Sequence, residues 1–250
     1  MEERFERYHP DMEAFQTDDL RALIFDVFGT VVDWRSGVIR EGETLGRRQD
    51  LDVDWAAFAG AWRSRYVPSM NRVRRKEIRW TNLDALHRAS LEELLREFGI
   101  RNLTEEEIDH LNRVWHRLDP WPDAVEGLTR LKSRYIIAPL SNGNVALLVN
   151  LAKRAGLPWD LILSAELVRH YKPDPETYLM APELLALRPD QVMMVAAHPD
   201  DLHAAQKYGL KTAYVPRPLE FGPQGEADPP DPSFDLVVSN FIELDRKLAG

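Results

Sequence analysis

The sequence predicts an α/β protein with a doubly wound parallel sheet and an inserted helical domain. Short runs of apolar and β-branched residues alternate with segments of helical periodicity, and the runs are continuously apolar. Such runs are typical of strands that are buried on both faces of a parallel sheet. One interval, from about Trp34 to Asp119, contains helical patterns but no convincing strand. A helical insertion within an α/β core accounts for both observations.

Six segments are expected to form the strands of the sheet. They are RALIFDVF (21–28), YIIAPLS (135–141), DLILSA (160–165), QVMMVAA (191–197), TAYVP (212–216) and DLVVSN (235–240). The segments between them with helical spacing are DAVEGLTRLKSR, NVALLVNLAKRAG, PETYLMAPELLAL and DDLHAAQKYG. Two of these end in glycine, which often follows the last residue of a helix. Strand–helix alternation of this kind predicts a doubly wound sheet.

The inserted domain is expected over residues 35–119, and the core over residues 1–34 and 120–250. Helical segments of the insertion include DWAAFAGAWRSRYV, NLDALHRASLEELLREFG and TEEEIDHLNRVWHRL. The last of these begins with Thr104 and Glu107, whose spacing predicts a capping box. The segment 217–234 is rich in proline and glycine and predicts a surface loop.

Composition excludes several kinds of site and partner. The chain of 250 residues contains no cysteine, which excludes disulfides, thiolate metal sites and cysteine nucleophiles. A formal charge of −9 argues against non-specific binding to nucleic acid, and an anionic substrate must therefore be attracted by local positive charge. The N-terminal MEERFERYHP has no apolar segment of a secretory signal, and no apolar run is long enough to span a membrane. A cytoplasmic location without membrane contact is expected.

Polar residues collect after four of the predicted strands. In strand order they are Asp26, Gly29 and Thr30, then Ser141, Asn142 and Gly143, then Lys172, then His198, Asp200 and Asp201. Ligands of open parallel sheets bind beyond the carboxyl ends of the strands, so these residues are expected to converge on one crevice. The SNG stretch also opens a helix, whose free N–H groups favour an anion.

These motifs resemble the haloacid dehalogenase superfamily and, within it, the type II 2-haloacid dehalogenases. The resemblance rests on FDVFGTVVD, SNG, YKPDPETY and the AWRSRY of the insertion, and it covers nearly the whole chain. It implies a Rossmann-like core, a helical cap and frequently a homodimer. It also implies that Asp26 is the nucleophile, with Ser141, Lys172 and the acidic cluster near Asp201 as the second, third and fourth motifs.

Two positions separate this chain from the phosphatases of that superfamily. Such a phosphatase needs a second acid two residues after the nucleophile, and an aspartate in the fourth motif that helps to hold Mg²⁺. Here these positions are Phe28 and Ala197. A halide departs as a stable anion without a proton, and an uncharged carbon–halogen bond needs no Mg²⁺ for charge neutralisation. The sequence therefore predicts no metal and no cofactor, and a small halogenated carboxylate as the substrate.

The predicted reaction has two steps. Asp26 attacks C2 of a 2-haloacid from the side opposite the halogen, so that halide leaves and an aspartyl ester forms. Water then attacks the carbonyl carbon of the ester, which releases a 2-hydroxyacid and restores Asp26. Lys172 is expected to keep the pKa of Asp26 low while the cap excludes water.

The resemblance implies a halide-binding pair, because a departing anion needs donors where the site offers no acid. Arg63 of AWRSRY and Asn142 occupy these positions. Arg65 is the competing arginine, and a spacing of two residues puts it on a different face of the helix. Arg63 on the helix surface, and Asn142 as a simple helix cap, remain the alternatives.

The remaining matched positions surround the nucleophile. Thr30 and Ser141 are expected to orient Asp26 or the substrate carboxylate. Tyr178, six residues after Lys172, is expected to pack beside that lysine. The acid at position 201 is expected to contact either the hydrolytic water or the lysine.

The fourth motif departs from the pattern of related dehalogenases, which commonly carry Ser at Ala196, Asn at His198 and an aromatic residue at Asp200. A histidine there is expected to activate the water as a base, or else only to cap the helix that follows. Phe28 and Trp34, together with Trp80 of the insertion, are expected to form a tight apolar pocket for small haloacetates.

Two other functions fit parts of the pattern. One is a small-molecule phosphatase with unusual metal binding. The other is a non-catalytic binding protein that has kept the fold, although the presence of Asp26, Lys172 and Asp201 argues against it.

Overall fold

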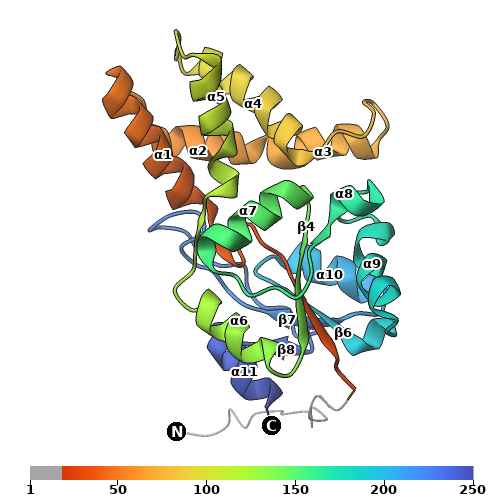
Figure 1. The fold of residues 1–250 in the computed structure, drawn as a ribbon. Helices are drawn as coiled ribbons and strands as arrows, with labels where there is room; N and C mark the ends of the chain where they lie inside the picture. The colour runs from red at the N-terminus through yellow and green to blue at the C-terminus, as the bar shows by residue number, and fades with distance from the viewer. Residues whose placement is uncertain (1–18, 250) are drawn as a thin grey trace, which may run out of the picture.

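The computed structural model describes residues 19–249 and contains a parallel sheet flanked by helices, with further helices at one end (Figure 1). The strands lie in the order β5-β4-β1-β6-β7-β8, and every pairing is parallel. They are β1 (Ala22–Phe25), β4 (Ile136–Ser141), β5 (Leu163–Ser164), β6 (Val192–Ala196), β7 (Lys211–Tyr214) and β8 (Leu236–Val237). The predicted doubly wound class is confirmed. The N-terminal segment MEERFERYHP lies outside the described residues.

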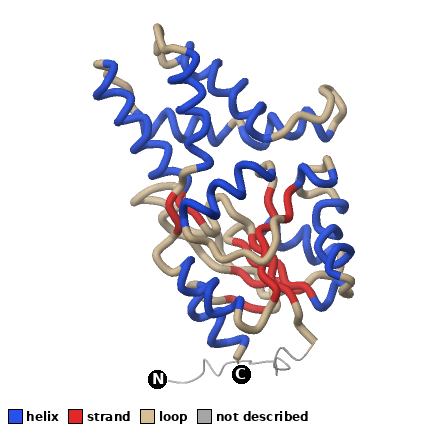
Figure 2. Tube along the Cα trace, in the orientation of Figure 1, coloured by secondary structure: helices blue, strands red, loops and turns tan. Residues whose placement is uncertain are grey.

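Helices cover both faces of the sheet, as Figure 2 shows for the core of the molecule. Leu23 and Phe25 of β1 share a hydrophobic cluster with apolar residues of α6 (Ala124–Lys132), α7 (Val145–Ala155) and α11 (Phe241–Leu248). Ala22 and Ile24 belong to a second cluster, with residues of α9 (Pro175–Leu185) and α10 (Pro199–Lys207). Alternate residues of one strand thus enter opposite layers, which explains why the predicted strands are continuously apolar.

The two edge strands are shorter than predicted. The segment 160–165 contributes only Leu163–Ser164, and the short helix α8 (Ala165–Val168) follows directly. Before this strand, the Asp160 carboxylate accepts a hydrogen bond from the backbone N–H of Ile137 at 2.9 Å. A side chain therefore replaces part of the backbone ladder at this edge. β8 is also limited to two residues, although the predicted run was six residues long.

The insertion forms a helical unit at one end of the sheet, at the top of Figure 1. Its helices are α1 (Trp34–Gln49), α2 (Trp55–Ser64), α3 (Tyr66–Arg74), α4 (Leu83–Glu97) and α5 (Glu105–Asn112), followed by the 3₁₀ turn η1 (Arg113–His116). The predicted segment 54–67 is not one helix: it contains all of α2 and the start of α3. Thr104 and Glu107 form the predicted capping box. Within residues 19–249, no helix combines the length and apolarity needed to cross a membrane.

A short antiparallel ribbon carries the chain into and out of the helical unit. Its strands are β2 (Val32–Asp33) and β3 (Asp119–Pro120), neither of which the sequence predicted. Two residues are too few to produce a strand pattern. We propose that this ribbon marks the boundary between the core and the cap, close to the limits expected at residues 35 and 119.

Candidate active site

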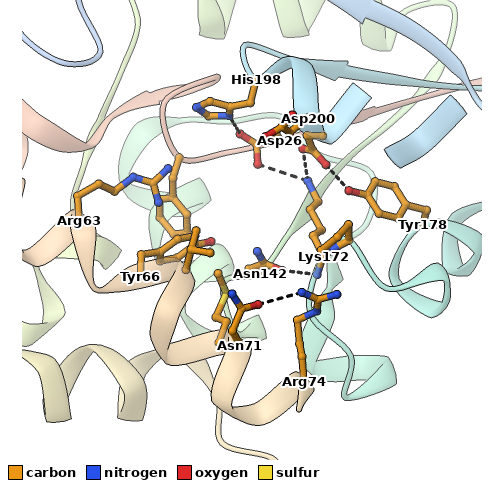
Figure 3. A pocket seen from close by; sticks show the side chains of 15 residues that line it. Asp26, Arg63, Tyr66, Asn71, Arg74, Asn142, Lys172, Tyr178, His198 and Asp200 are labelled. Atoms are coloured by element: carbon orange, nitrogen blue, oxygen red, sulfur yellow. Dashed lines mark hydrogen bonds and ion pairs between the residues drawn. The ribbon is translucent and has the colours of Figure 1, made fainter. Parts of the chain in front are cut away.

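A cavity of about 290 Å³ lies where the carboxyl ends of the strands meet the cap (Figure 3). The cap contributes Arg63, Tyr66, Val67, Met70, Asn71 and Arg74, from α2 and α3. The core contributes Asp26, Phe28, Asn142, Lys172, Pro173, Tyr178, His198, Asp200 and Asp201. Most of the residues expected at the strand ends therefore converge as predicted.

Asp26 directly follows β1, and its two oxygens face different partners. Oδ2 accepts a hydrogen bond from the Thr30 hydroxyl at 2.8 Å and lies 3.2 Å from Nδ1 of His198. Oδ1 lies 3.3 Å from Nζ of Lys172. Burial would raise the pKa of Asp26, but the charges of Lys172 and His198 hold it well below its usual range. Asp26 is thus an ionised, largely buried carboxylate at the wall of the cavity.

Lys172 lies between two carboxylates. Its Nζ is 2.7 Å from Oδ2 of Asp201, closer than its distance of 3.3 Å from Asp26. Burial would lower the pKa of Lys172, but Asp201 and Asp26 together raise it. The Tyr178 hydroxyl donates to the other oxygen of Asp201 at 2.5 Å. The expected pairing of Asp201 with Lys172 is confirmed, and burial together with the charge of Asp26 raises the pKa of Asp201.

His198 occupies the N-cap position of α10, but its side chain caps no backbone N–H. Instead, Nδ1 faces Asp26 at 3.2 Å and Nε2 faces Glu220 at 3.0 Å. Burial would lower the pKa of His198, but hydrogen bonds and charge from Asp26 and Glu220 raise it to about 10. The resting imidazole is therefore protonated at neutral pH. A protonated ring cannot accept a proton from water, so the predicted role as a base does not fit the resting site.

Glu220 was not predicted to take part in the site. It is 3% exposed, and its carboxylate accepts a hydrogen bond from the indole N–H of Trp34 at 2.9 Å. Nη2 of Arg63 lies 4.0 Å away. No pattern in the sequence indicates this residue, because a single acid in a segment rich in proline and glycine has no periodicity that predicts burial.

The prediction of a surface loop over residues 217–234 is wrong for its first turn. Arg217 is 9% exposed; its Nε donates to the backbone oxygen of Thr30 at 2.9 Å, and its guanidinium pairs with Asp123 at 2.6 Å. The turn is thereby fixed against the loop that follows Asp26. Most later residues of the segment are half-buried or exposed, as expected.

Arg63 and Asn142 both line the cavity. The guanidinium of Arg63 projects from α2 and lies over the ring of Tyr66 (Figure 3). Oδ1 of Asn142 accepts the backbone N–H of Lys172 at 2.9 Å. Arg65, the competing arginine, is turned away and forms an ion pair of 2.6 Å with Glu97.

Four predicted site residues lie outside the cavity wall, and one of them, Thr30, still contacts Asp26. Trp34 is 1% exposed, and its indole N–H donates to Glu220. Its ring does not line the cavity. Trp80 stacks on Tyr171 at 4.8 Å and lines a separate cavity. The hydroxyl of Ser141 accepts the backbone N–H of Gly143 at 3.1 Å, so that it supports the SNG turn without reaching Asp26. Of the three aromatic residues expected to form an apolar pocket, only Phe28 lines the cavity.

The donors around Asp26 do not fit a Mg²⁺ ion, which prefers carboxylate oxygens and water. Both oxygens of Asp26 face cationic groups, Lys172 and His198. The ring of Phe28 packs edge-on against Trp115 with the centroids 5.6 Å apart. In the part of the chain that the structure describes, no cluster of three or more histidine or acidic side chains is arranged to hold a metal ion.

The fold and this site agree with the comparisons to known proteins. The family model described as haloacid dehalogenase-like hydrolase matches residues 20–209. The chain belongs to this family. Haloacid dehalogenase-like hydrolases with related sequences include (S)-2-haloacid dehalogenase 4A of Burkholderia cepacia, 33% identical over 221 residues that span 82% of this chain and 89% of that protein. The (S)-2-haloacid dehalogenase 1 of Pseudomonas sp. strain CBS-3 is 28% identical, over 83% of this chain and 91% of its own length.

Solved structures of the family are also similar to this hydrolase. A defluorinating L-2-haloacid dehalogenase superposes with a TM-score of 0.90 at 46% identity, covering 92% of this chain and 96% of that one. A second L-2-haloacid dehalogenase has a TM-score of 0.87 at 47% identity, with 92% and 99% coverage. Both are similar over the core and the cap, so the similarity includes the elements that form the cavity.

Proposed function

We propose that this haloacid dehalogenase-like hydrolase converts small (S)-2-haloacids into 2-hydroxyacids and halide, through an ester on Asp26 and without a metal ion. The observation that carries the proposal is the ionised Asp26, which is held between Lys172 and His198. The residue two positions later is Phe28, so the site has no second acid there. The preference for the (S) configuration follows the names of the related enzymes.

In the first step, Oδ1 of Asp26 attacks C2 of the substrate and displaces the halide. Oδ2 is engaged by Thr30 and His198, whereas among residues 19–249 the polar contact of Oδ1 is with Lys172, so Oδ1 is the less engaged oxygen. A bond forms between Oδ1 and C2 while the carbon–halogen bond breaks and its electron pair leaves with the halide. Burial strengthens the nucleophile, because a carboxylate with few contacts to water is more reactive.

Arg63 and Asn142 are the proposed donors to the departing halide. Both line the cavity, and Arg63 is held by its contact with the ring of Tyr66. A halide needs charge stabilisation and no proton, so a guanidinium and an amide are sufficient. The cationic groups at the cavity also attract an anionic substrate to a chain whose formal charge is −9.

In the second step, water attacks Cγ of the ester, the bond from Cγ to Oδ1 breaks, and Oδ1 leaves on C2 as the hydroxyl oxygen of the product. Asp201 is the proposed acceptor of the water proton, since its pKa is raised and it lies beside Lys172. Tyr178 donates to Asp201 and fixes its orientation. Asp201 passes this proton to the departing oxygen, the hydroxyacid leaves, and ionisation of the new carboxyl group restores Asp26.

Halide release from (S)-2-chloropropionate tests this function directly. We expect turnover that Asp26→Asn abolishes, and much slower release from the (R) enantiomer. Phosphate release from p-nitrophenyl phosphate in the presence of Mg²⁺, together with no halide release, would show that the chain is a phosphatase of this family instead.

A homodimer and a cytoplasmic location are further proposals, which rest on the family resemblance and on the charge and apolar pattern of the sequence. Light scattering after size-exclusion chromatography tests the first, and fractionation of the producing cells tests the second.

A further inference from the structure

Glu220 is a buried carboxylate to which the proposed reaction assigns no role. It comes from the turn after β7, whereas the other acids of the site follow β1 and β6. Both of its oxygens lie near Nε2 of His198, at 3.0 and 3.1 Å. Trp34 donates to one of them, and Arg63 lies 4.0 Å from the same oxygen. This carboxylate therefore has two hydrogen-bond partners, His198 and Trp34, and a cation nearby in an almost fully buried position.

The surrounding chain leaves room for this carboxylate and fixes it in place. A Cβ at Gly29 would lie 2.2 Å from Oε1 of Glu220, so only glycine permits the approach. The backbone N–H of Glu220 donates to the oxygen of Arg217 at 3.0 Å, and Arg217 in turn donates to the backbone oxygen of Thr30. The turn that carries Glu220 is thus attached to the loop that carries the nucleophile.

We propose that Glu220 is a positioning residue, which keeps His198 protonated and its Nδ1–H directed at Oδ2 of Asp26. An imidazole whose two nitrogens both face carboxylate oxygens donates from both, and only the imidazolium has two N–H groups. The catalytic consequence rests on the proposed function, whereas the protonation of His198 does not.

This contact matters most after the ester has formed. Asp26 then carries no charge, so His198 loses one of the two carboxylates that hold its proton. Glu220 is the carboxylate that remains. His198 therefore stays protonated during the step in which negative charge develops on Asp26.

The electron pairs of that step show where the proton is needed. As the oxygen of water bonds to Cγ, the π pair of the carbonyl moves onto Oδ2, which receives hydrogen bonds from His198 and Thr30. The pair then returns, the bond from Cγ to Oδ1 breaks, and Oδ1 leaves on C2 as the hydroxyl of the hydroxyacid, which takes one proton of the water. The second proton leaves when the carboxyl group of Asp26 ionises. His198 thus acts as an oxyanion donor and not as a base.

Four charged groups near His198 influence the pKa of its ring. Asp26, after β1, and Glu220, after β7, face it directly and favour the protonated ring. Lys172 lies beyond Asp26, and Arg63 of the cap lies beyond Glu220; both favour the neutral ring. Asp200, on the same helix as the His198 N-cap, lines the same cavity.

Nitrogen NMR of the histidine rings tests the protonation directly. We expect the His198 midpoint near pH 10 in the unchanged chain, and a midpoint about 1–3 units lower in Glu220→Gln, because one adjacent opposite charge is lost. Glu220→Asp keeps the charge and should lie between them. Asp231→Asn removes the carboxylate of a second histidine–carboxylate pair, 3.0 Å from His203, and should leave the His198 midpoint unchanged.

Asp26→Asn supplies a second measurement that leaves Glu220 intact. Its neutral amide imitates the charge of the ester, and we expect His198 still to titrate well above the ordinary value of about 6.5. A midpoint at or below that value would overturn the proposal even if Glu220→Gln failed to fold. An unchanged midpoint in a folded Glu220→Gln chain would overturn it as well.

The kinetic measurement separates this proposal from the proposed function. In Glu220→Gln we expect a burst of halide at the rate of the unchanged chain. The rate of ester hydrolysis that follows should begin to decline at a pH about 1–3 units lower than in the unchanged chain. Equal ester hydrolysis at all pH values would show that Glu220 has only a structural role. If the unchanged chain released no halide, the proposed function would fail, and the ring titrations would still decide whether Glu220 holds the proton.

Discussion

The guanidinium of Arg63 lies over the ring of Tyr66, with Cζ 4.4 Å from the ring centroid. A cation over an aromatic face is held in one orientation without a salt bridge that neutralises it. The carboxylate nearest to Arg63 is Glu220, at 4.0 Å, which is longer than a hydrogen bond. The guanidinium thus keeps donors that an anion in the cavity can use.

Arg63→Ala is therefore expected to slow ester formation by about 10²–10³-fold, the usual cost of removing one preorganised donor to developing charge. Single-turnover measurement of halide release isolates this step. Arg65→Ala is the matched control, since Arg65 pairs with Glu97 on the surface of the cap. Its loss should change stability by about 1 kcal/mol or less and leave the rate nearly unchanged. Similar rate losses in the two variants would show that the halide binds elsewhere.

Metal independence is the second prediction. Phe28 and Ala197 supply no oxygen ligand from their side chains, and both oxygens of Asp26 face cations. Dialysis against EDTA should leave the rate of halide release within experimental error of the untreated enzyme. Loss of activity on chelation, with recovery on addition of Mg²⁺, would contradict this assignment.

Three of the residues that the sequence predicted correctly follow strands of the sheet, Lys172 with the short helix α8 in between. Asp26, Lys172 and Asp201 are far apart in the chain, but parallel strands bring their carboxyl ends to one edge. Their positions follow from strand order and from continuous apolar runs, which are local properties of the sequence. The contact of Lys172 with both acids therefore needed no knowledge of side-chain packing.

Glu220 and Trp34 show why the rest of the site was not predicted. Trp34 was expected at the cavity, but the direction in which an indole packs depends on neighbours from distant segments. Its neighbour is Glu220, an acid in a loop without periodicity, which can lie against Gly29 only because that residue has no side chain. Such relationships arise from tertiary structure and leave no pattern in the sequence around either residue.

The third prediction concerns stability and pH. The pKa of His198 is raised to about 10 in the folded chain, above the value of about 6.5 for an unfolded histidine. Below pH 6.5 both forms hold the proton, and the stabilisation is complete. Between these values only the folded form holds it, so the free energy of unfolding falls as pH rises, by up to about 1.4 kcal/mol per pH unit.

His198→Asn removes this contribution. Urea unfolding of both chains between pH 6 and pH 10 should show that the advantage of the unchanged chain declines through this interval. Groups remote from His198 titrate alike in both chains and cancel in the difference. A difference that stays constant with pH would contradict the raised pKa and the protonated resting state of His198.

The last prediction tests the nucleophile. If Oδ1 of Asp26 forms the ester, the new oxygen of the product comes from the protein, and water replaces it afterwards. With enzyme in excess in ¹⁸O-labelled water, the first-turnover hydroxyacid should be mostly unlabelled. After several turnovers, mass spectrometry should find the label in the peptide that contains Asp26.

The competing mechanism is direct attack of water on C2, with Asp26 as a general base. It predicts label in the product on the first turnover and none in the protein. Both mechanisms invert the configuration at C2, because hydrolysis of the ester leaves the bond from C2 to oxygen intact, so stereochemistry does not separate them. Asp26→Asn should form no ester, since a neutral amide is a poor nucleophile at saturated carbon.

The contacts of Asp26 favour the covalent mechanism: a carboxylate whose pKa is held well below its usual range by Lys172 and His198 is a weak base toward water. The same carboxylate lies beside the cavity with one oxygen free of hydroxyl donors, which suits attack on carbon.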